Sequence, residues 1–321
     1  MPVKAEVPLE YRRAAECALP ELTELEVVRH YTKLSQLNFC IDTHFYPLGS
    51  CTMKYNPKFT ENLARLPGFM NLHPLLPQLQ PGGILTQGAL QVLYEMDRLL
   101  CEITGLDAFT LQPAAGAQGE LTGLKIIAAY HRRKRRSRSV ILIPDSAHGT
   151  NPASAALSGF VVEKLRSGPD GLVDLADLKQ KLTRDVAALM LTNPNTLGLF
   201  EREITTIAAL LHEHDALVYM DGANMNALLG IARPGDMGVD ILQLNLHKTF
   251  STPHGGGGPG AGPVGVRFEL EPFLPVPRVR RTGSKFAWDD RGRWTVGRAH
   301  GFYGNIGVLV RAYAYIRTLG R

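Results

Sequence analysis

A carboxylate and a lysine that could do chemistry together each follow a predicted strand. Asp221 comes directly after the apolar run 216–220, and His247 and Lys248 follow the run 241–246. The carboxyl ends of neighbouring parallel strands meet at one edge of a sheet, so both side chains are expected there. A structural ion pair would explain them. A pyridoxal-phosphate (PLP) site would also do so, because a carboxylate can keep the pyridine nitrogen protonated while a lysine forms an imine with the cofactor.

A glycine-rich turn between a predicted strand and a predicted helix offers a place for a phosphate group. It has the sequence QPAAGAQGE and covers residues 112–120. Small residues let the backbone approach an anion, and a helix N-terminus presents unpaired N–H donors. Many such turns are only tight turns, and the junction between a strand and a helix is what favours a binding role here.

Two further polar segments follow predicted strands. His148 lies in AHGTNP, residues 147–152, and could stack on an aromatic cofactor, although such a histidine more often caps a helix or lies at the surface. Thr196 lies in TNPNTLG, residues 192–198, where polar side chains could bond a cofactor ring or simply form a turn.

The elements that must position these residues alternate between strands and helices. Strands are expected at 108–111, 140–143, 159–164, 187–192, 216–220, 241–246 and 262–266. Helices are expected near 119–130, 150–158, 174–182, 203–214 and 222–229. This alternation predicts an α/β fold with a mostly parallel sheet, which binds ligands at the carboxyl ends of its strands.

Three segments are expected along the chain. Residues 1–84 read as an N-terminal arm that includes a helix at 22–37 and a stretch rich in proline and glycine. Residues 85–297 form the large α/β domain, whose first helix is expected at 85–104. Residues 298–321 contain a final helical pattern.

The composition is that of an ordinary globular protein, with 321 residues, 45% hydrophobic residues and a net charge of +5. No apolar run is long enough to span a membrane, and residues 1–13 resemble neither a secretory signal nor a transit peptide. The four cysteines are scattered, which indicates free thiols in a reducing cytoplasm. They are Cys17, Cys40, Cys51 and Cys101.

Much of the positive charge lies in one run, HRRKRRSRS, at residues 131–139. It falls between an apolar helix and an apolar strand, so a solvated helix end is the favoured interpretation, since cations suit the C-terminal end of a helix dipole. A patch that binds nucleic acid is the alternative.

Four motifs, taken in order, resemble the glycine decarboxylase (P-protein) family of the glycine cleavage system. They are AGAQGE, AHGTNPASA, DGANMNALLG and NLHKTFSTPHGGGGPG. The segments IDTHFYPLGSCTMKYNP and FYGNIGVLVRAYAYIRTLG extend the resemblance over nearly the whole chain, and it is closest to the second subunit of the two-subunit form. NLHKTF together with DGAN is specific, whereas the glycine runs alone are not.

The resemblance implies the fold-type I architecture of PLP enzymes related to aspartate aminotransferase. Lys248 would carry pyridoxal 5'-phosphate covalently as a Schiff base. Asp221 would pair with the pyridine nitrogen, while Ala223 and His148 would lie against the two faces of the ring. Lys248, Asp221 and His148 are therefore the candidate catalytic residues.

The same resemblance assigns further contacts. Gly116 and Ala117, with His247, would contact the phosphate. Ala115 stands where many fold-type I enzymes have a hydroxyl residue, so the phosphate would depend more on backbone N–H groups. Thr196 is expected at the cofactor as well, from the position of its polar turn rather than from the resemblance.

Candidates for the substrate side are less firmly placed by the resemblance. Thr43 and His44 of the arm are expected at the mouth of the site. Arg298 and His300 are candidates for binding the carboxylate of glycine.

The implied reaction is decarboxylation of glycine with transfer of the aminomethyl group to the lipoyl arm of the H-protein. The implied assembly is a heterotetramer with two copies of a first subunit, and neither nucleic acid nor a membrane is expected as a partner. Fold-type I enzymes usually finish with a small C-terminal domain, and this chain would end in the helix that leads to it.

Three alternatives remain open at this point. The chain could be another fold-type I enzyme, such as an amino-acid decarboxylase or a desulfurase. It could be a non-catalytic subunit that supports an active partner, although the presence of both Asp221 and Lys248 argues against this. Binding of nucleic acid through residues 131–139 is the third.

Overall fold

The computed structural model describes residues 7–15, 17–44, 55–76, 84–253 and 260–320. The chain forms two compact units, residues 1–47 and residues 48–321. None of the helices in the described ranges is both long and apolar enough to cross a membrane.

The first unit contains a short 3-10 helix, η2 (Leu9–Tyr11), and helix α1 (Glu24–Gln36). Helix α1 begins at a capping box. The backbone N–H of Glu26 donates to the Thr23 side chain, and the Glu26 carboxylate accepts from the backbone N–H of Thr23. These two bonds satisfy N–H groups that have no partner inside the helix. The helix predicted at 22–37 is therefore confirmed.

The second unit contains the sheet and the helices that cover it. Its helices are α2 (Lys58–Ala64), α3 (Pro67–Met70), α4 (Gln87–Thr104), α5 (Gly116–Arg133), α6 (Thr150–Leu157), α7 (Leu175–Lys181), α8 (Ile204–Glu213), α9 (Leu246–Thr249) and α10 (Ile306–Leu319). Its strands are β1 (Ala108–Thr110), β2 (Val140–Pro144), β3 (Val161–Leu165), β4 (Val186–Thr192), β5 (Leu217–Gly222), β6 (Ile241–Leu244), β7 (Val264–Val266), β8 (Arg278–Thr282) and β9 (Lys285–Asp289).

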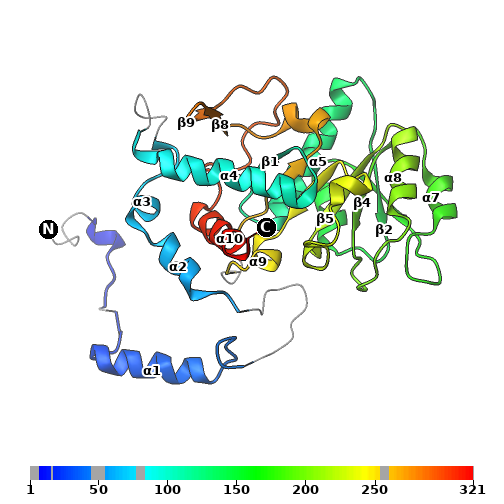
Figure 1. Ribbon diagram of the computed structural model, residues 1–321. Coiled ribbons are helices and arrows are strands. Elements are labelled where there is room, and N and C mark those ends of the chain that lie inside the picture. The colour runs from blue at the N-terminus through cyan, green and yellow to red at the C-terminus, as the bar shows by residue number, and fades with distance from the viewer. Residues whose placement is uncertain (1–6, 16, 45–54, 77–83, 254–259, 321) are drawn as a thin grey trace. The chain divides into compact units, whose positions relative to one another are not determined.

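Seven of the described strands form one sheet in the order β1-β7-β6-β5-β4-β2-β3. Strands β6, β5, β4, β2 and β3 pair in parallel, and β7 runs antiparallel to both of its neighbours. Strands β5, β4 and β2 can be followed side by side in Figure 1. The predicted α/β fold with a mostly parallel sheet is confirmed.

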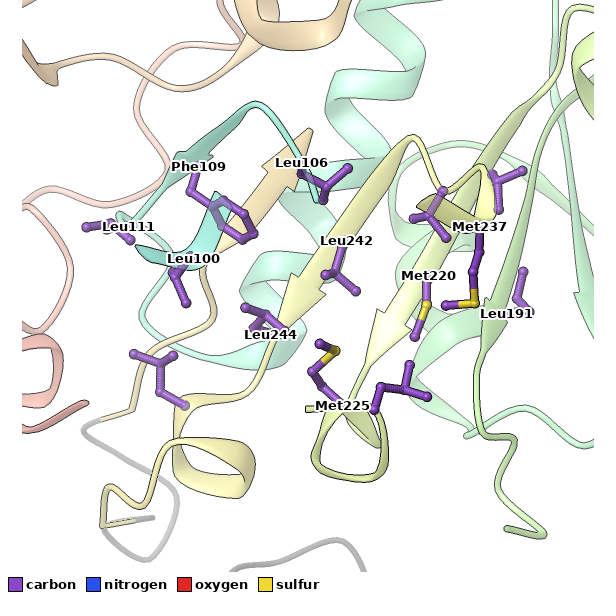
Figure 2. Close-up of a cluster of buried hydrophobic side chains, with 14 of the residues drawn as sticks. Leu100, Leu106, Phe109, Leu111, Leu191, Met220, Met225, Met237, Leu242 and Leu244 are labelled. Carbon is purple, nitrogen blue, oxygen red and sulfur yellow. The ribbon is translucent and has the colours of Figure 1, made fainter. Parts of the chain in front are cut away.

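Buried apolar side chains form a separate cluster on each face of this sheet. One cluster joins the sheet to α4, α7, α8 and α10, and the other joins it to α5 and α6. Figure 2 shows part of the first cluster, including Met220 of β5 and Leu242 and Leu244 of β6. Alternate residues of each strand thus face opposite helical layers, as the period of two requires.

Helix α5 lies unusually close to the sheet because one of its faces consists of glycine. A Cβ atom on Gly119 would lie 2.7 Å from the Gly262 carbonyl oxygen, and one on Gly123 would lie 2.3 Å from Tyr219 Cε2. Only glycine permits this approach. The close packing directs the N-terminus of α5 to the carboxyl edge of β6.

Two sequence predictions about elements were wrong, and one element was missed. The helix expected at 222–229 is only a 3-10 turn, η5 (Met225–Ala227). The strand expected at 241–246 stops at Leu244, and Leu246 begins the single turn α9. The tail from 270 to 297 contains the hairpin β8–β9, which was not expected.

The basic run at 131–139 contains the end of α5, as predicted. The Arg133 guanidinium lies over the ring of Trp294, and Arg136 forms a salt bridge with Asp215. Arg138 donates to two backbone carbonyl groups. Among the cysteines, Cys17, Cys40 and Cys101 are free thiols, and Cys51 lies outside the described residues.

Candidate active site

The parallel pairing of β4, β5 and β6 places three polar residues in a row at the carboxyl edge of the sheet. Asp221 lies opposite Thr192 of β4 on one side and Gln243 of β6 on the other. All three side chains are buried. Polar residues at the end of otherwise apolar strands are expected where a parallel sheet binds a ligand.

Asp221 is the buried carboxylate at the centre of the predicted site. Its Oδ1 accepts from the backbone N–H of Ala223 at 2.9 Å and from Gln243 Nε2 at 2.6 Å. Burial raises the pKa of Asp221, while its hydrogen bond from Ala223 and the positive charges of Lys248 and His148 act to lower it. The Ala223 N–H therefore binds this buried carboxylate, and Lys248 and His148 lie near enough for their charges to act on its pKa.

Lys248 and His247 reach the edge of the sheet on α9, the helical turn that follows β6. Lys248 is half-buried and its backbone N–H donates to the Asn245 carbonyl at 3.0 Å, whereas His247 is buried. The two residues are therefore one turn beyond the strand rather than at its end. The turn begins at Leu246, whose backbone N–H is held by the Ala261 carbonyl.

The predicted phosphate turn lies against the same edge. Helix α5 begins after Ala115, and no side chain caps its N-terminus. A Cβ atom on Gly116 would lie 2.5 Å from Asn245 Nδ2, and one on Gly262 would lie 2.2 Å from the Ala115 carbonyl oxygen. Ala115 and Ala117 are exposed at this turn.

Two residues that the sequence pattern did not single out connect Asp221 to this turn. Gln243 Nε2 donates to Asn245 Oδ1 at 3.2 Å as well as to Asp221, and Asn245 lies against Gly116. The signal was present in the sequence, because Gln243 and Asn245 alternate with leucines in an otherwise apolar strand. Period-two alternation places them on one face of the sheet.

His148 belongs to a second polar group, which includes a residue that was also missed. Thr150 Oγ1 lies 2.9 Å from His148 Nδ1 and donates to Glu120 Oε1 at 2.9 Å. Burial raises the pKa of Glu120. Glu120 lies one turn into α5, where a glutamate is easily taken for a surface residue.

The remaining predicted site residues belong to the first unit or have no hydrogen bond with Asp221 in the described part of the chain. Thr196 is exposed in the turn after β4 and lines a small hollow that also includes Thr192. Thr43 and His44 belong to the first unit, where Thr43 Oγ1 and His44 Nδ1 are 2.7 Å apart. Their place at the site stays a prediction.

The segment that carries Arg298 and His300 is held beside the turn at Gly116. The carbonyl of Ala299 accepts from Gln118 Nε2 at 2.7 Å, and its N–H donates to Gln112 Oε1 at 3.0 Å. Arg298 lies 3.5 Å from Asp290. The structure therefore keeps this segment near α5 without assigning either side chain to a substrate.

A family model described as the glycine cleavage system P-protein matches residues 3–279 of the chain. The chain belongs to the glycine cleavage system P-protein family. The sequence resemblance is thereby confirmed over most of the chain.

Two relatives within the P-protein family come from Caldanaerobacter subterraneus subsp. tengcongensis and Halalkalibacterium halodurans. Each is 56% identical to this chain over 320 residues and is named "Probable glycine dehydrogenase (decarboxylating) subunit 2". The alignments cover 99% of this chain. The chain spans 65% and 64% of the lengths of these two relatives.

Two solved structures share the P-protein fold seen here. A crystal structure of a glycine decarboxylase (P-protein) in inhibitor-bound form has a TM-score of 0.77 and 21% identity, and the match covers 99% of this chain and 72% of that one. A sphingosine-1-phosphate lyase from Burkholderia pseudomallei K96243 has a TM-score of 0.65 and 17% identity, with 100% and 73% covered. The architecture is fold type I, as predicted.

The edge of the sheet in this P-protein chain fits PLP, the cofactor associated with fold type I. Asp221 is a buried carboxylate of the kind that a protonated ring nitrogen requires, and the N-terminus of α5 has no side-chain cap. Thr192 Oγ1 and Gln243 Oε1 are buried without a hydrogen-bond partner among the described residues. Buried polar atoms normally have partners, so these two indicate that a polar ligand belongs beside Asp221.

Proposed function

We propose that this chain binds pyridoxal 5'-phosphate covalently on Lys248 and decarboxylates glycine, passing the aminomethyl group to the lipoyl arm of the H-protein. The observation that carries the proposal is the buried carboxylate of Asp221, which accepts from the Ala223 N–H and lies near enough to Lys248 and His148 for their charges to act on its pKa. When bound, PLP supplies an electron sink for the pair of electrons left behind as the carboxylate of glycine departs as CO2.

In this proposal Asp221 holds a proton at the ring nitrogen. Burial raises the pKa of Asp221, and a cation placed against the carboxylate would favour its ionised form. The hydrogen bonds from Ala223 and Gln243 orient the carboxylate from the strand side. The buried setting excludes water, which strengthens the interaction between the carboxylate and the charged ring.

The other residues bind and orient. Gly116 and Ala117 would donate backbone N–H groups to the phosphate at the start of α5, and His247 would contribute from α9. The uncapped helix N-terminus favours an anion at this position. His148 and Ala223 would lie against the two faces of the ring, and Thr196 is proposed at the cofactor only because its turn follows β4.

The partners are proposed from the family and from the names of the relatives. We expect a first P-protein subunit, in a heterotetramer with two copies of each chain, and a lipoylated H-protein that brings the acceptor to the site. Thr43 and His44, with Arg298 and His300, remain the candidates for contacts with glycine.

The covalent link is tested by replacing Lys248. The Lys248→Ala variant, mixed with PLP, should lack the visible absorbance of covalently bound cofactor and should yield no labelled lysine after borohydride reduction. Lys125→Ala, which alters an exposed lysine on α5, is the matched control and should keep both signals. An unchanged absorbance band in Lys248→Ala would overturn the assignment.

The reaction is tested separately by the exchange of CO2 into the carboxyl group of glycine. The complex of this chain, the first subunit and lipoylated H-protein should catalyse the exchange, and omission of the H-protein should reduce it. Exchange or turnover with another amino acid, without activity on glycine, would instead favour one of the other fold-type I enzymes.

A further inference from the structure

Gln243 is a buried amide on the strand next to Asp221. It is only 1% exposed and lies opposite Asp221 in the parallel pairing of β5 and β6. A Cβ atom on Gly119 of α5 would lie 3.2 Å from Gln243 Cβ, so this glycine leaves room for the amide between the helix and the sheet. The packing of α5 on β6 therefore determines where the amide lies.

The amide nitrogen of Gln243 donates to two oxygen atoms. Nε2 lies 2.6 Å from Asp221 Oδ1 and 3.2 Å from Asn245 Oδ1. An amide nitrogen carries two hydrogens, so each oxygen can receive one of them. A hydrogen bond as short as the first is typical of a charged acceptor. The geometry therefore favours an ionised Asp221.

The amide oxygen of Gln243 gains nothing from this position in the cofactor-free chain. Oε1 is buried without a hydrogen-bond partner among the described residues, and a buried polar atom without a partner costs free energy. An apolar side chain of similar length would avoid this cost. The contact between Nε2 and Asp221 is therefore what accounts for an amide here.

Burial raises the pKa of the Asp221 carboxyl, because the charged form loses contact with water. Donors and cations oppose burial, since they stabilise the charged form. Besides Gln243, they are the Ala223 N–H, the charges of Lys248 and His148, and the Asn151 side chain. Negative charge on Glu120 or Tyr219 acts in the same direction as burial.

We infer that Gln243 is a positioning residue that keeps Asp221 ionised, so that a proton shared with a bound ring stays on the ring nitrogen. Ala223 and Gln243 both donate to Oδ1, so neither occupies Oδ2, which can serve the ring nitrogen. Without Gln243, burial would favour a neutral carboxylic acid that keeps the proton. The inference deepens the proposed function and rests on it only for the identity of the ring.

The first test titrates Asp221 in the cofactor-free full chain, by ¹³C NMR of labelled aspartate carboxyl groups. Asp221→Asn identifies the signal. Gln243→Met removes the donor at similar length and should raise the proton affinity of Asp221 about tenfold, as expected when one hydrogen bond to a charged group is lost. Gln243→Glu sets two buried carboxyl groups against each other, so the pair should take up a proton at still higher pH.

Thr192→Val is the matched control, because Thr192 lies opposite Asp221 on β4, the other neighbouring strand. Its buried Oγ1 has no hydrogen-bond partner among the described residues, so its loss should leave the titration of Asp221 unchanged. An equal rise in Thr192→Val would mean that looser packing moves the titration, and the inference would fail. A midpoint that is unchanged or lower in Gln243→Met would overturn it too.

A second variant covers the case in which Gln243→Met does not fold. Gln243→Asn keeps an amide that is one methylene too short for the contact with Asp221, and it should also move the midpoint to higher pH. An Asp221 midpoint in Gln243→Asn equal to that of the wild type would contradict the inference.

The second test follows the ring nitrogen itself, with PLP that carries ¹⁵N at this atom. The wild-type chain should hold the nitrogen protonated at neutral pH. Gln243→Met should move the resonance toward that of the unprotonated ring, while borohydride still fixes the cofactor on Lys248. A ring that stays fully protonated in Gln243→Met would overturn the inference.

Activity in the assembled complex gives an independent result. Gln243→Met should lower kcat for CO2 exchange about tenfold, with little change in KM, because the amide acts on the charge of the ring rather than on the binding of glycine. If the wild-type chain binds no PLP on Lys248, the proposed function fails, whereas the titration of the cofactor-free chain still decides whether Gln243 keeps Asp221 ionised.

Discussion

At the scale of single residues, Asp221 combines burial with a charge that the proposed chemistry requires. Burial raises its pKa more than the hydrogen bond from Ala223 and the charges of Lys248 and His148 lower it. The folded chain therefore binds a proton at this carboxyl more readily than the unfolded chain does. The resulting cost to stability is absent at low pH and develops as the pH rises through the raised pKa of the folded state.

Replacement of Asp221 by Asn should therefore stabilise the cofactor-free chain at neutral pH. The gain should be about 1 kcal/mol, the usual size of a single-residue effect, and urea unfolding measures it. The same change should lower activity in the complex about a hundredfold or more, because the ring nitrogen loses its ionic partner. Asp185→Asn, at an exposed site, should change neither quantity, and a destabilised Asp221→Asn chain would contradict the argument.

At the scale of elements, helix α5 can pack closely on the sheet because the face that it turns to the sheet carries glycines, among them Gly119 and Gly123. Gly123→Ala should destabilise the chain because the new Cβ would lie 2.3 Å from Cε2 of Tyr219, which is fully buried. Overpacking costs about 1–3 kcal/mol, whereas the gain in helix propensity is at most about 1 kcal/mol. We therefore expect Gly123→Ala to lower the free energy of unfolding, which thermal or urea unfolding measures.

Gly88→Ala provides the matched control for this comparison. Gly88 lies in α4, and no atom lies within 4 Å of the Cβ that alanine would add. We expect a neutral or slightly stabilising effect, up to about 1 kcal/mol, through the lower entropy of the unfolded chain. Equal effects at Gly88 and Gly123 would show that packing against Tyr219 does not matter.

The elements also show how far the sequence could predict the structure. Buried parallel strands such as β4 and β5 form continuous apolar runs, so their existence and the side chains at their ends were predictable. The turn α9 was not, because Leu246 continues the alternation of leucines with polar residues that begins in β6, and its backbone N–H still bonds the Ala261 carbonyl in the register of the β6–β7 pairing. The hairpin β8–β9 was missed because its strands carry many charged side chains.

For the site, the sequence predicted the residues at strand ends and missed those that connect them. Asp221, His148 and Lys248 follow strands, where function is expected. Gln243 and Glu120 act through partners 22 and 30 residues away along the chain. Such distant pairs depend on the packing of α5 and α6 on the sheet, which local patterns do not determine.

At the scale of the whole second unit, one contact between distant parts of the sequence ties α2 to α10. Arg311 donates to both carboxylate oxygens of Glu61, at 2.7 and 2.8 Å, across 250 residues of sequence. The hydrogen bond from Arg311 lowers the pKa of Glu61. This carboxylate therefore stabilises the folded chain above its unfolded pKa, and the contribution is lost as the pH falls through the lowered value.

A double-mutant cycle with Glu61→Gln and Arg311→Met should give a favourable coupling energy at neutral pH. Both side chains are only partly buried, so the coupling should be at most about 1 kcal/mol, and it should fade in acid as Glu61 takes up a proton. Urea unfolding of the wild type, the two single variants and the double variant measures it. A coupling that persists when Glu61 is protonated would mean that packing between α2 and α10, rather than the ion pair, joins these two helices.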